Sequence, residues 1–258
     1  MSKNILFEKK EDIGIITINS PETNNAFNKE MLSNWLDILI KYKKDNEVKG
    51  LILTGKGRVF CSGGNVEDMV NGKMSGWEMK KFLTDYVHKI ALEMETFYKP
   101  VVAAINGAAI GAGLDMSLMC DFRIASEKAV LSEAYIKLGL IAGDGGCFFL
   151  PRIVGRQKAL ELLLTGKILK ANEALEWGLV DKVVAHDELL EQSIMFLQKI
   201  IRWPSEAVQL MKKMIYASEH QTLRDHLSEI SSHMGMLSMK EEFIASAKKI
   251  LNKAVNKS

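Results

Sequence analysis

The sequence has few cysteines and no long apolar run, and both absences narrow the class of protein. Its three cysteines, Cys61, Cys120 and Cys147, are too few and too odd in number for a disulfide framework. They form no C-x-x-C pair, which argues against a zinc site of the common type. The first residues lack the apolar core of a signal peptide. The most apolar stretch, 101–114, is too short to span a bilayer. We therefore expect a cytoplasmic protein of enzyme size.

An excess of charge of one sign is also lacking. Lys and Arg total 34 and Asp and Glu total 32, so the net charge is only +2. A net charge this small does not indicate a nucleic-acid or membrane partner. The hydrophobic fraction of 47% excludes disorder as the dominant state, and a chain of this length can bury a sizeable core. No internal repeat and no low-complexity segment is visible.

Strand-like and helix-like segments alternate along the first part of the chain. Short β-branched segments at 13–19, 48–54 and 101–106 predict strands. Apolar residues at helical spacing predict helices at 29–43 and 77–97. Further short strands are expected at 123–125 and 129–131, and further helices at 158–164, 171–177, 187–201 and from 204 to the C-terminus. This order predicts an α/β core with parallel strands, at 1–200, and a helical C-terminal region at 201–258.

Two glycine-rich turns each join a predicted strand to a predicted helix. The first is FCSGGN at 60–65, and the second is NGAAIGAGLD at 106–115. Glycine lets backbone N–H groups approach a ligand closely, and N–H groups at a helix start favour negative charge. Two such N–H groups aimed at one oxygen form an oxyanion hole. Taken singly, each turn is more often structural than functional.

Several other glycine motifs are absent. Neither turn has the G-x-G-x-x-G spacing of a dinucleotide site or the G-K-[ST] ending of a P-loop. No G-x-S-x-G marks a serine nucleophile. The two turns therefore need another explanation.

Together with their neighbouring segments, the turns resemble the enoyl-CoA hydratase/isomerase (crotonase) family. The resemblance is carried by NAFN at 25–28, VFCSGGNVEDM at 59–69, the run from KPVVAAINGAAIGAGLD to DFRIAS at 99–126, and the run from LGLIAGDGG to DKVV at 138–184. It implies an α/β fold of the ClpP/crotonase type, a spiral of β-β-α units followed by a helical C-terminal region. It also implies a homotrimer or homohexamer with the C-terminal helices at the interface. It also implies chemistry on an acyl-CoA thioester without a metal or redox cofactor, coenzyme A being part of the substrate.

The resemblance also implies a set of site residues. The oxyanion hole falls on the backbone N–H groups of Ser62 and Ala112. Residues expected to line the substrate and coenzyme A site are Ala26, Gly63, Gly64, Gly111, Gly113 and Glu133. The coenzyme A phosphates should meet Lys or Arg side chains, and the choice among Lys29, Lys56, Arg58, Lys248 and Lys249 stays open.

The sequence departs from the family at the acid and base. The hydratases of the family use two glutamates, and the matching positions here hold Asp115 and Tyr135. Asp144, between glycines, is similar to an aspartate in a branch that hydrolyses a carbon–carbon bond of a cyclic diketone. We assign catalysis to Asp115, Tyr135 and Asp144. The structural alternatives are a helix-face acid for Asp115 and a turn former or helix N-cap for Asp144, while Glu133 is more often structural.

These observations favour one function and leave others open. We expect an enzyme that stabilises the enolate of an acyl-CoA thioester, and enoyl-CoA hydration is the reaction we favour. Replacement of both glutamates keeps double-bond isomerisation, and hydrolysis of a thioester or β-diketone, as alternatives. A non-catalytic coenzyme A-binding homologue is the alternative from a different class.

Overall fold

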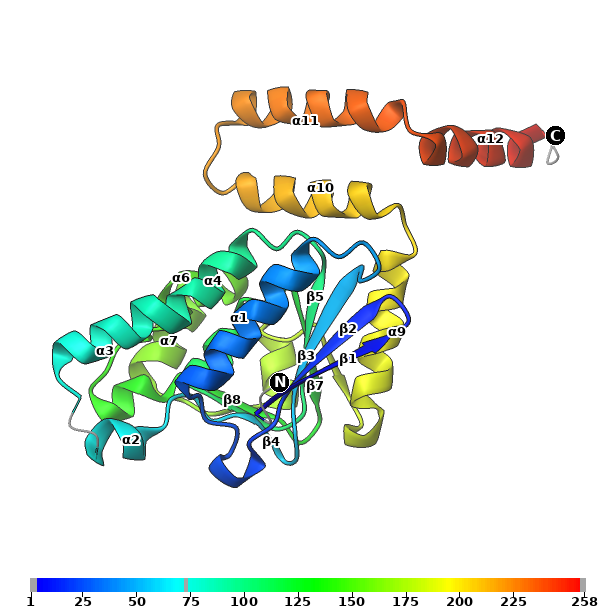
Figure 1. Cartoon of the computed structure of the whole chain (residues 1–258). Helices are drawn as coiled ribbons and strands as arrows, with labels where there is room; N and C mark the ends of the chain where they lie inside the picture. The colour runs from blue at the N-terminus through cyan, green and yellow to red at the C-terminus, as the bar shows by residue number, and fades with distance from the viewer. Residues whose placement is uncertain (1–3, 72–73, 256–258) are drawn as a thin grey trace. The chain divides into compact units, whose positions relative to one another are not determined.

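Two β-sheets organise the first part of the chain (Figure 1). The structure is a computed structural model that describes residues 4–71 and 74–255. The larger sheet has the order β1 (Ile5–Lys10), β2 (Ile13–Ile18), β3 (Gly50–Gly55), β5 (Val101–Ile105), β7 (Phe122–Ser126) and β10 (Lys182–Val184). The smaller sheet has the order β4 (Val59–Cys61), β6 (Ala108–Ile110), β8 (Val130–Ser132) and β9 (Leu169–Lys170). Each of the pairs β3–β4, β5–β6 and β7–β8 gives its first strand to the larger sheet and its second to the smaller.

Helices follow the strand pairs and cover the sheets. The first part of the chain contains η1 (Pro21–Thr23), α1 (Lys29–Lys43), α2 (Val66–Asn71), α3 (Gly76–Phe82), η2 (Leu83–Val87), α4 (His88–Glu95), α5 (Ala112–Leu118), η3 (Ala134–Leu138), α6 (Gly146–Val154), α7 (Arg156–Thr165), α8 (Ala171–Glu176), η4 (His186–Glu188) and α9 (Leu189–Ile201). The segments η1, η3 and η4 are 3-10 helices, and η2 is a π-helix. The predicted helix over 77–97 is therefore α3, η2 and α4 in succession (Figure 1).

The predicted parallel pairing is present in the larger sheet. Strands β2, β3, β5, β7 and β10 pair in parallel, and only β1 joins antiparallel, as a hairpin with β2. All five residues of β5 are buried, as expected of a central strand with both faces covered. Helix α1 begins where Asn28 accepts a hydrogen bond from the Met31 N–H at 2.8 Å, and it buries Trp35 and Leu39 in the main core.

The chain divides into two compact units, Met1–Lys199 and Ile200–Ser258. The second unit contains α10 (Ser205–Ala217), α11 (Leu223–Ser238) and α12 (Glu241–Val255). The helical region expected from 204 onward consists of these three helices, and its last residues, 256–258, lie outside the described part. Thr222 caps α11 by accepting a hydrogen bond from the Asp225 N–H at 3.2 Å. No helix in the described residues is long and apolar enough to cross a membrane.

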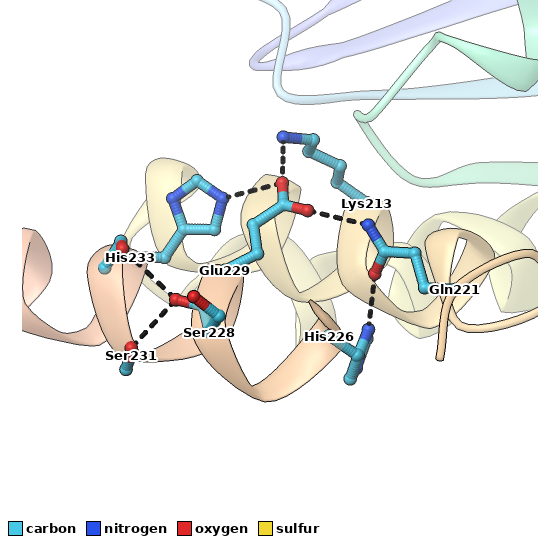
Figure 2. Close-up of polar contacts among 8 residues, drawn as sticks. Lys213, Gln221, His226, Ser228, Glu229, Ser231 and His233 are labelled. Carbon is cyan, nitrogen blue, oxygen red and sulfur yellow. Dashed lines mark hydrogen bonds and ion pairs between the residues drawn. The ribbon is translucent and has the colours of Figure 1, made fainter. Parts of the chain in front are cut away.

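A polar network connects α10 to α11 in this second unit (Figure 2). Glu229 of α11 accepts hydrogen bonds from Lys213 Nζ of α10 at 2.7 Å and from Gln221 Nε2 at 2.8 Å. His233 Nε2 lies 3.3 Å from the same carboxylate. Lys213 thus links α10 to α11 through Glu229, Gln221 joins from the connecting loop, and His233 lies on α11 itself.

Candidate active site

Adjacent parallel strands bring the two glycine turns together. Strand β4 leads into the first turn and β6 into the second, and Cys61 of β4 pairs with Ala109 of β6. Because parallel strands end at the same edge of a sheet, both turns and the helices α2 and α5 begin side by side. The sequence therefore places two helix starts beside one another.

Glycine is required where the two turns touch. A Cβ on Gly113 would lie 2.0 Å from the Cys61 carbonyl oxygen, which is closer than any real contact. Gly63 has a φ of +92°, and a Cβ there would lie 2.9 Å from the Ile110 carbonyl oxygen and 3.3 Å from the Ala112 nitrogen. Side chains at either position would force the backbones apart, so both glycines permit this close approach.

The two proposed oxyanion donors differ in their present partners. Ala112 is the first residue of α5, so its N–H has no partner within the helix. The Ser62 N–H donates to the Asn24 carbonyl oxygen at 3.1 Å. A substrate oxygen at this place would share that N–H with Asn24 or replace Asn24.

Asn25 fixes the segment that lies against the first turn, and sequence reasoning did not single it out. Its buried side chain accepts from the Ser20 N–H at 2.9 Å and donates to the Val59 and Lys56 carbonyl oxygens at 2.7 and 3.0 Å. Asn25 also has a φ of +56°, a conformation that asparagine tolerates better than most residues. The signal in the sequence was the NAFN segment, which begins with Asn25.

The remaining residues expected to line the substrate site lie on these same turns. Ala26 is buried next to Asn25, and Gly64 forms an isolated parallel bridge with Phe27. Gly111 is the N-cap of α5, with a φ of +52°. The structure thus gathers these turn residues at one place, whereas Glu133 is a separate case.

Three side chains from separate segments meet beside the start of α5. The Tyr135 hydroxyl of η3 donates to Asp115 Oδ2 of α5 at 2.7 Å and to Asp144 Oδ2 at 3.0 Å. Asp144 lies in the turn that precedes α6. A single phenol hydroxyl therefore bridges two carboxylates. Ala112 is the first and Asp115 the fourth residue of α5. The Asp115 side chain and the Ala112 N–H therefore both belong to the first turn of this helix.

Burial dominates the electrostatics of this cluster. Asp115 is 0% exposed and Asp144 is 5% exposed. Burial, with the Asp144 charge, raises the pKa of Asp115 to about 7, although hydrogen bonds from Tyr135 oppose this. Burial likewise raises the pKa of Asp144, while Tyr135 and His88 lower it. Burial and the two carboxylates raise the pKa of Tyr135 far above its ordinary value, so the phenol stays protonated.

Glu133 lies deeper than its assignment to the substrate site implied. It is 0% exposed, and neither of its carboxyl oxygens has a hydrogen-bond partner. The segment is not extended beyond Ser132, because Tyr135 already belongs to the 3-10 helix η3. Glu133 and Tyr135 therefore do not share one face of an extended strand. Tyr135 donates to Asp115, and burial, together with the Asp115 carboxyl group, raises the pKa of Glu133.

His88 positions the Asp144 turn and was not singled out from the sequence. Its Nε2 lies 2.9 Å from the Gly143 carbonyl oxygen. His88 begins α4 directly after the π-helix η2, and π-helical segments are frequent at functional sites. No sequence motif surrounds this histidine, so only its place in the fold reveals the contact.

The two cysteines near the site differ in exposure. Cys61 is fully buried, and burial raises the pKa of its thiol to about 12, which makes it a poor nucleophile. Cys147 is exposed at the start of α6.

Within residues 4–71 and 74–255, no group of three or more His, Cys, Asp or Glu side chains is placed to hold a metal ion.

A cavity of about 390 Å³ lies next to the first glycine turn. It is lined by Phe27, Asn28, Lys29, Glu30, Gly64, Asn65, Met69, Met74 and Phe82. The Lys29 ammonium lies 5.7 Å from the centre of the Tyr86 ring. The cavity therefore combines an apolar lining with a positively charged side chain.

Comparison with known proteins identifies the class to which this fold and site belong. Residues 8–251 match the model of the enoyl-CoA hydratase/isomerase family. The chain belongs to this family, as the sequence motifs predicted, and it is an enzyme of this family.

Individual relatives agree with this assignment. The chain is 38% identical to crotonyl-CoA hydratase of Syntrophomonas wolfei over 213 residues, which is 81% of this chain and 80% of the relative. It is 35% identical to a probable mitochondrial enoyl-CoA hydratase of Dictyostelium discoideum over 218 residues, 84% of this chain and 77% of the relative. The crystal structure of an enoyl-CoA hydratase from Bacillus anthracis superposes with a TM-score of 0.91 at 30% identity, covering 97% of this chain and 96% of that one. The crotonase-like fold is confirmed.

Proposed function

We propose that this protein hydrates the double bond of a 2-enoyl-CoA thioester. The observation that carries the proposal is the Tyr135 hydroxyl, which donates to both Asp115 and Asp144 beside the start of α5. Hydration needs a base for the attacking water and an acid for the α-carbon, and this cluster offers two carboxyl groups at one place. Relatives named as enoyl-CoA hydratases support the same reaction.

The thioester carbonyl would lie against the two glycine turns. The N–H groups of Ser62 and Ala112 would polarise the carbonyl and stabilise the enolate that forms when water adds to the β-carbon. A pair of fixed donors can supply a few kcal/mol at the point where the charge develops. The oxygen would meet the Ala112 N–H at the start of α5, and it would compete with the Asn24 carbonyl oxygen for the Ser62 N–H.

Asp115 and Asp144 would serve as the acid and the base. A pKa of about 7 for Asp115 suits a group that takes and returns a proton near neutral pH. Tyr135 would orient the two carboxylates rather than transfer its own proton, because burial and both acids raise its pKa.

The coenzyme A portion would bind at the cavity next to the first turn. Phe27 and Met69 supply apolar surface there, and Lys29 supplies a positive charge for a phosphate. Of the basic residues left open by the sequence, Lys29 is the one that lines this cavity. The reaction requires no metal and no redox cofactor.

Double-bond isomerisation is a second candidate, and one observation favours it. The shared hydroxyl joins the two carboxylates into a continuous chain, so a proton removed by one acid could be returned to another carbon by the other. An isomerase needs only one base that shuttles a proton, and no attacking water.

We also propose a homotrimer or homohexamer, in the cytoplasm, with 201–258 at the interface. The helices of this region expose many large apolar side chains, among them Met211, Ile215, Leu223, Met239 and Leu251. Exposed apolar patches of this kind mark interaction sites. Sedimentation analysis of the full chain against a variant with Met211 and Ile215 changed to Ser would test this assembly.

The experiment that tests the function follows crotonyl-CoA by loss of its conjugated-thioester absorbance. We expect turnover by the wild type and a loss of about 100-fold or more in Asp144→Asn, with no change in the exposed control Asp187→Asn. Turnover that survives in Asp144→Asn would remove the role of Asp144. Binding without hydration, together with movement of the double bond in a 3-enoyl-CoA, would establish the isomerase instead.

A further inference from the structure

Glu133 is a buried acid for which the proposed reaction has no use. Among the described residues, three buried side-chain oxygens have no hydrogen-bond partner, namely Oε1 and Oε2 of Glu133 and Oδ1 of Asp115. All three belong to two neighbouring carboxyl groups. A buried polar atom without a partner is costly and is rarely retained, so the meeting of these two carboxyl groups requires an explanation.

The two carboxyl groups act on each other: a side-chain hydrogen bond between them contributes to the pKa of both. Two ionised carboxylates offer only acceptors, so such a bond exists only when one of them carries a proton. A single proton would give a partner to Asp115 Oδ1 and to one oxygen of Glu133. Asp115 Oδ2 would remain available to accept from Tyr135.

We propose that Glu133 is a positioning residue, whose carboxylic acid proton is donated to Asp115 Oδ1 and holds the Asp115 carboxylate in place for the reaction. The shared proton is inferred from the unpartnered buried oxygens and the burial of both acids, whereas its effect on turnover rests on the proposed function. Glu133 acts through Asp115 and does not touch substrate. With Glu133 neutral, the pair carries one negative charge, on Asp115.

The surroundings of the pair favour this arrangement. Three groups face Glu133: Asp115 of α5, Asp144 of the turn before α6, and Cys147 of α6. None of them is a cation. Burial, followed by the Asp115 charge, raises the pKa of Glu133 well above its ordinary value. Asp115, in contrast, accepts the Tyr135 hydrogen bond and lies in the field of the Gly146 N–H dipole. Both interactions lower the pKa of Asp115 and favour its ionised form. The proton therefore resides on Glu133.

The start of α6 confines the Asp115 carboxylate on the other side. A Cβ on Gly146 would lie 2.3 Å from Asp115 Oδ1, so only glycine leaves room for this oxygen. The Gly146 N–H acts on the carboxylate electrostatically but forms no hydrogen bond of ordinary geometry to Oδ1. Glu133 is thus the group available to hold Oδ1.

Infrared spectroscopy of the full-length protein tests the shared proton without any assay of activity. We expect a protonated-carboxyl C=O band that remains in the wild type at about pH 8, where an Asp115 with a pKa of about 7 is mostly ionised, and we expect this band to be lost in Glu133→Gln. The exposed control Glu127→Gln should leave it unchanged. Absence of the band in the wild type, or its persistence in Glu133→Gln, would overturn the shared proton on Glu133.

Kinetics with crotonyl-CoA tests the positioning role. Glu133→Gln keeps a donor for Asp115 Oδ1, so kcat should stay within about threefold of the wild type. Glu133→Met removes the donor, so kcat should fall at least tenfold with KM unchanged, and the acid limb of the pH profile should move to higher pH. Equal profiles for the Gln and Met variants would overturn the role. If the wild type does not hydrate crotonyl-CoA, the proposed function fails. The infrared result still shows whether Glu133 carries the shared proton.

Discussion

The Tyr135 hydroxyl donates to Asp115 Oδ2 at 2.7 Å and thereby opposes the effect of burial on that acid. Burial and the Asp144 charge raise the pKa of Asp115 to about 7, and the Tyr135 hydrogen bond lowers it. The phenol itself cannot ionise in the working range, because burial and both acids raise its pKa. Tyr135 is therefore a fixed donor that keeps a proportion of Asp115 ionised at neutral pH.

Removal of this donor should change the pH dependence of the reaction. Tyr135→Phe keeps the ring and loses the hydroxyl, so the pKa of Asp115 should rise by about one unit, equivalent to about 1.4 kcal/mol. We expect kcat for crotonyl-CoA at neutral pH to fall about fivefold, as the ionised fraction of Asp115 falls, and the acid limb of the pH–rate profile to shift upward. Full activity with an unmoved acid limb would show that Tyr135 does not control Asp115.

The role of the Ala112 N–H can be tested by removing only that hydrogen. Proline is well suited to the first position of a helix, and Ala112 holds this position in α5. Ala112→Pro should therefore fold and lose about 100-fold in kcat, as expected for loss of one oxyanion donor. Gly76→Pro is the matched control, because Gly76 begins α3 with no atom near a new Cβ. Similar kcat values for the two variants would exclude Ala112 from the oxyanion hole.

Periodicity in the sequence predicted the regular parts of the fold and missed the irregular ones. Helix α1 has the predicted bounds, because its apolar residues recur at helical spacing between clear end signals. Strand β1 was missed since four of its six residues are exposed or charged, and the three-residue strands β4 and β6 are too short to show a pattern. Helix α6 was missed because it begins with glycine and contains Pro151.

The site shows a similar division. The family motifs pointed to Asp115, Tyr135 and Asp144, which the fold brings into contact although they come from three segments. The contacts of His88 with Gly143 and of Glu133 with Asp115 could not be predicted. They depend on which side chains become buried together, and that is decided by packing between distant segments rather than by local pattern.

The buried acid Asp115 should make stability depend on pH. Its pKa rises from 3.8 to about 7 on folding. A raised pKa contributes stability that is fully present below pH ~4 and is lost as the pH rises through about 7. Three units correspond to at most about 4 kcal/mol. Denaturant titrations should show the free energy of unfolding of Asp115→Asn falling less over this window than that of the wild type. Parallel pH curves would show that folding does not raise the pKa of Asp115.

The network in the helical unit should give the opposite pH dependence. Glu229 accepts from Lys213, Gln221 and His233 (Figure 2), and the Lys213 hydrogen bond, first among these, lowers the pKa of Glu229 from 4.5 to about 2. A lowered pKa contributes stability that is present above pH ~4.5 and is lost as the pH falls toward 2.

Amide hydrogen exchange in the full chain, corrected for its intrinsic pH dependence, measures this effect across α10 and α11. We expect protection in the wild type to decrease as the pH falls below about 4.5. Glu229→Gln should show low protection at every pH, because the neutral amide cannot replace a carboxylate that accepts from Lys213. The exposed first-turn acid Glu242 of α12 provides the control, and Glu242→Gln should behave as the wild type. Wild-type protection that does not change with pH would show that the converging donors do not hold the hairpin together.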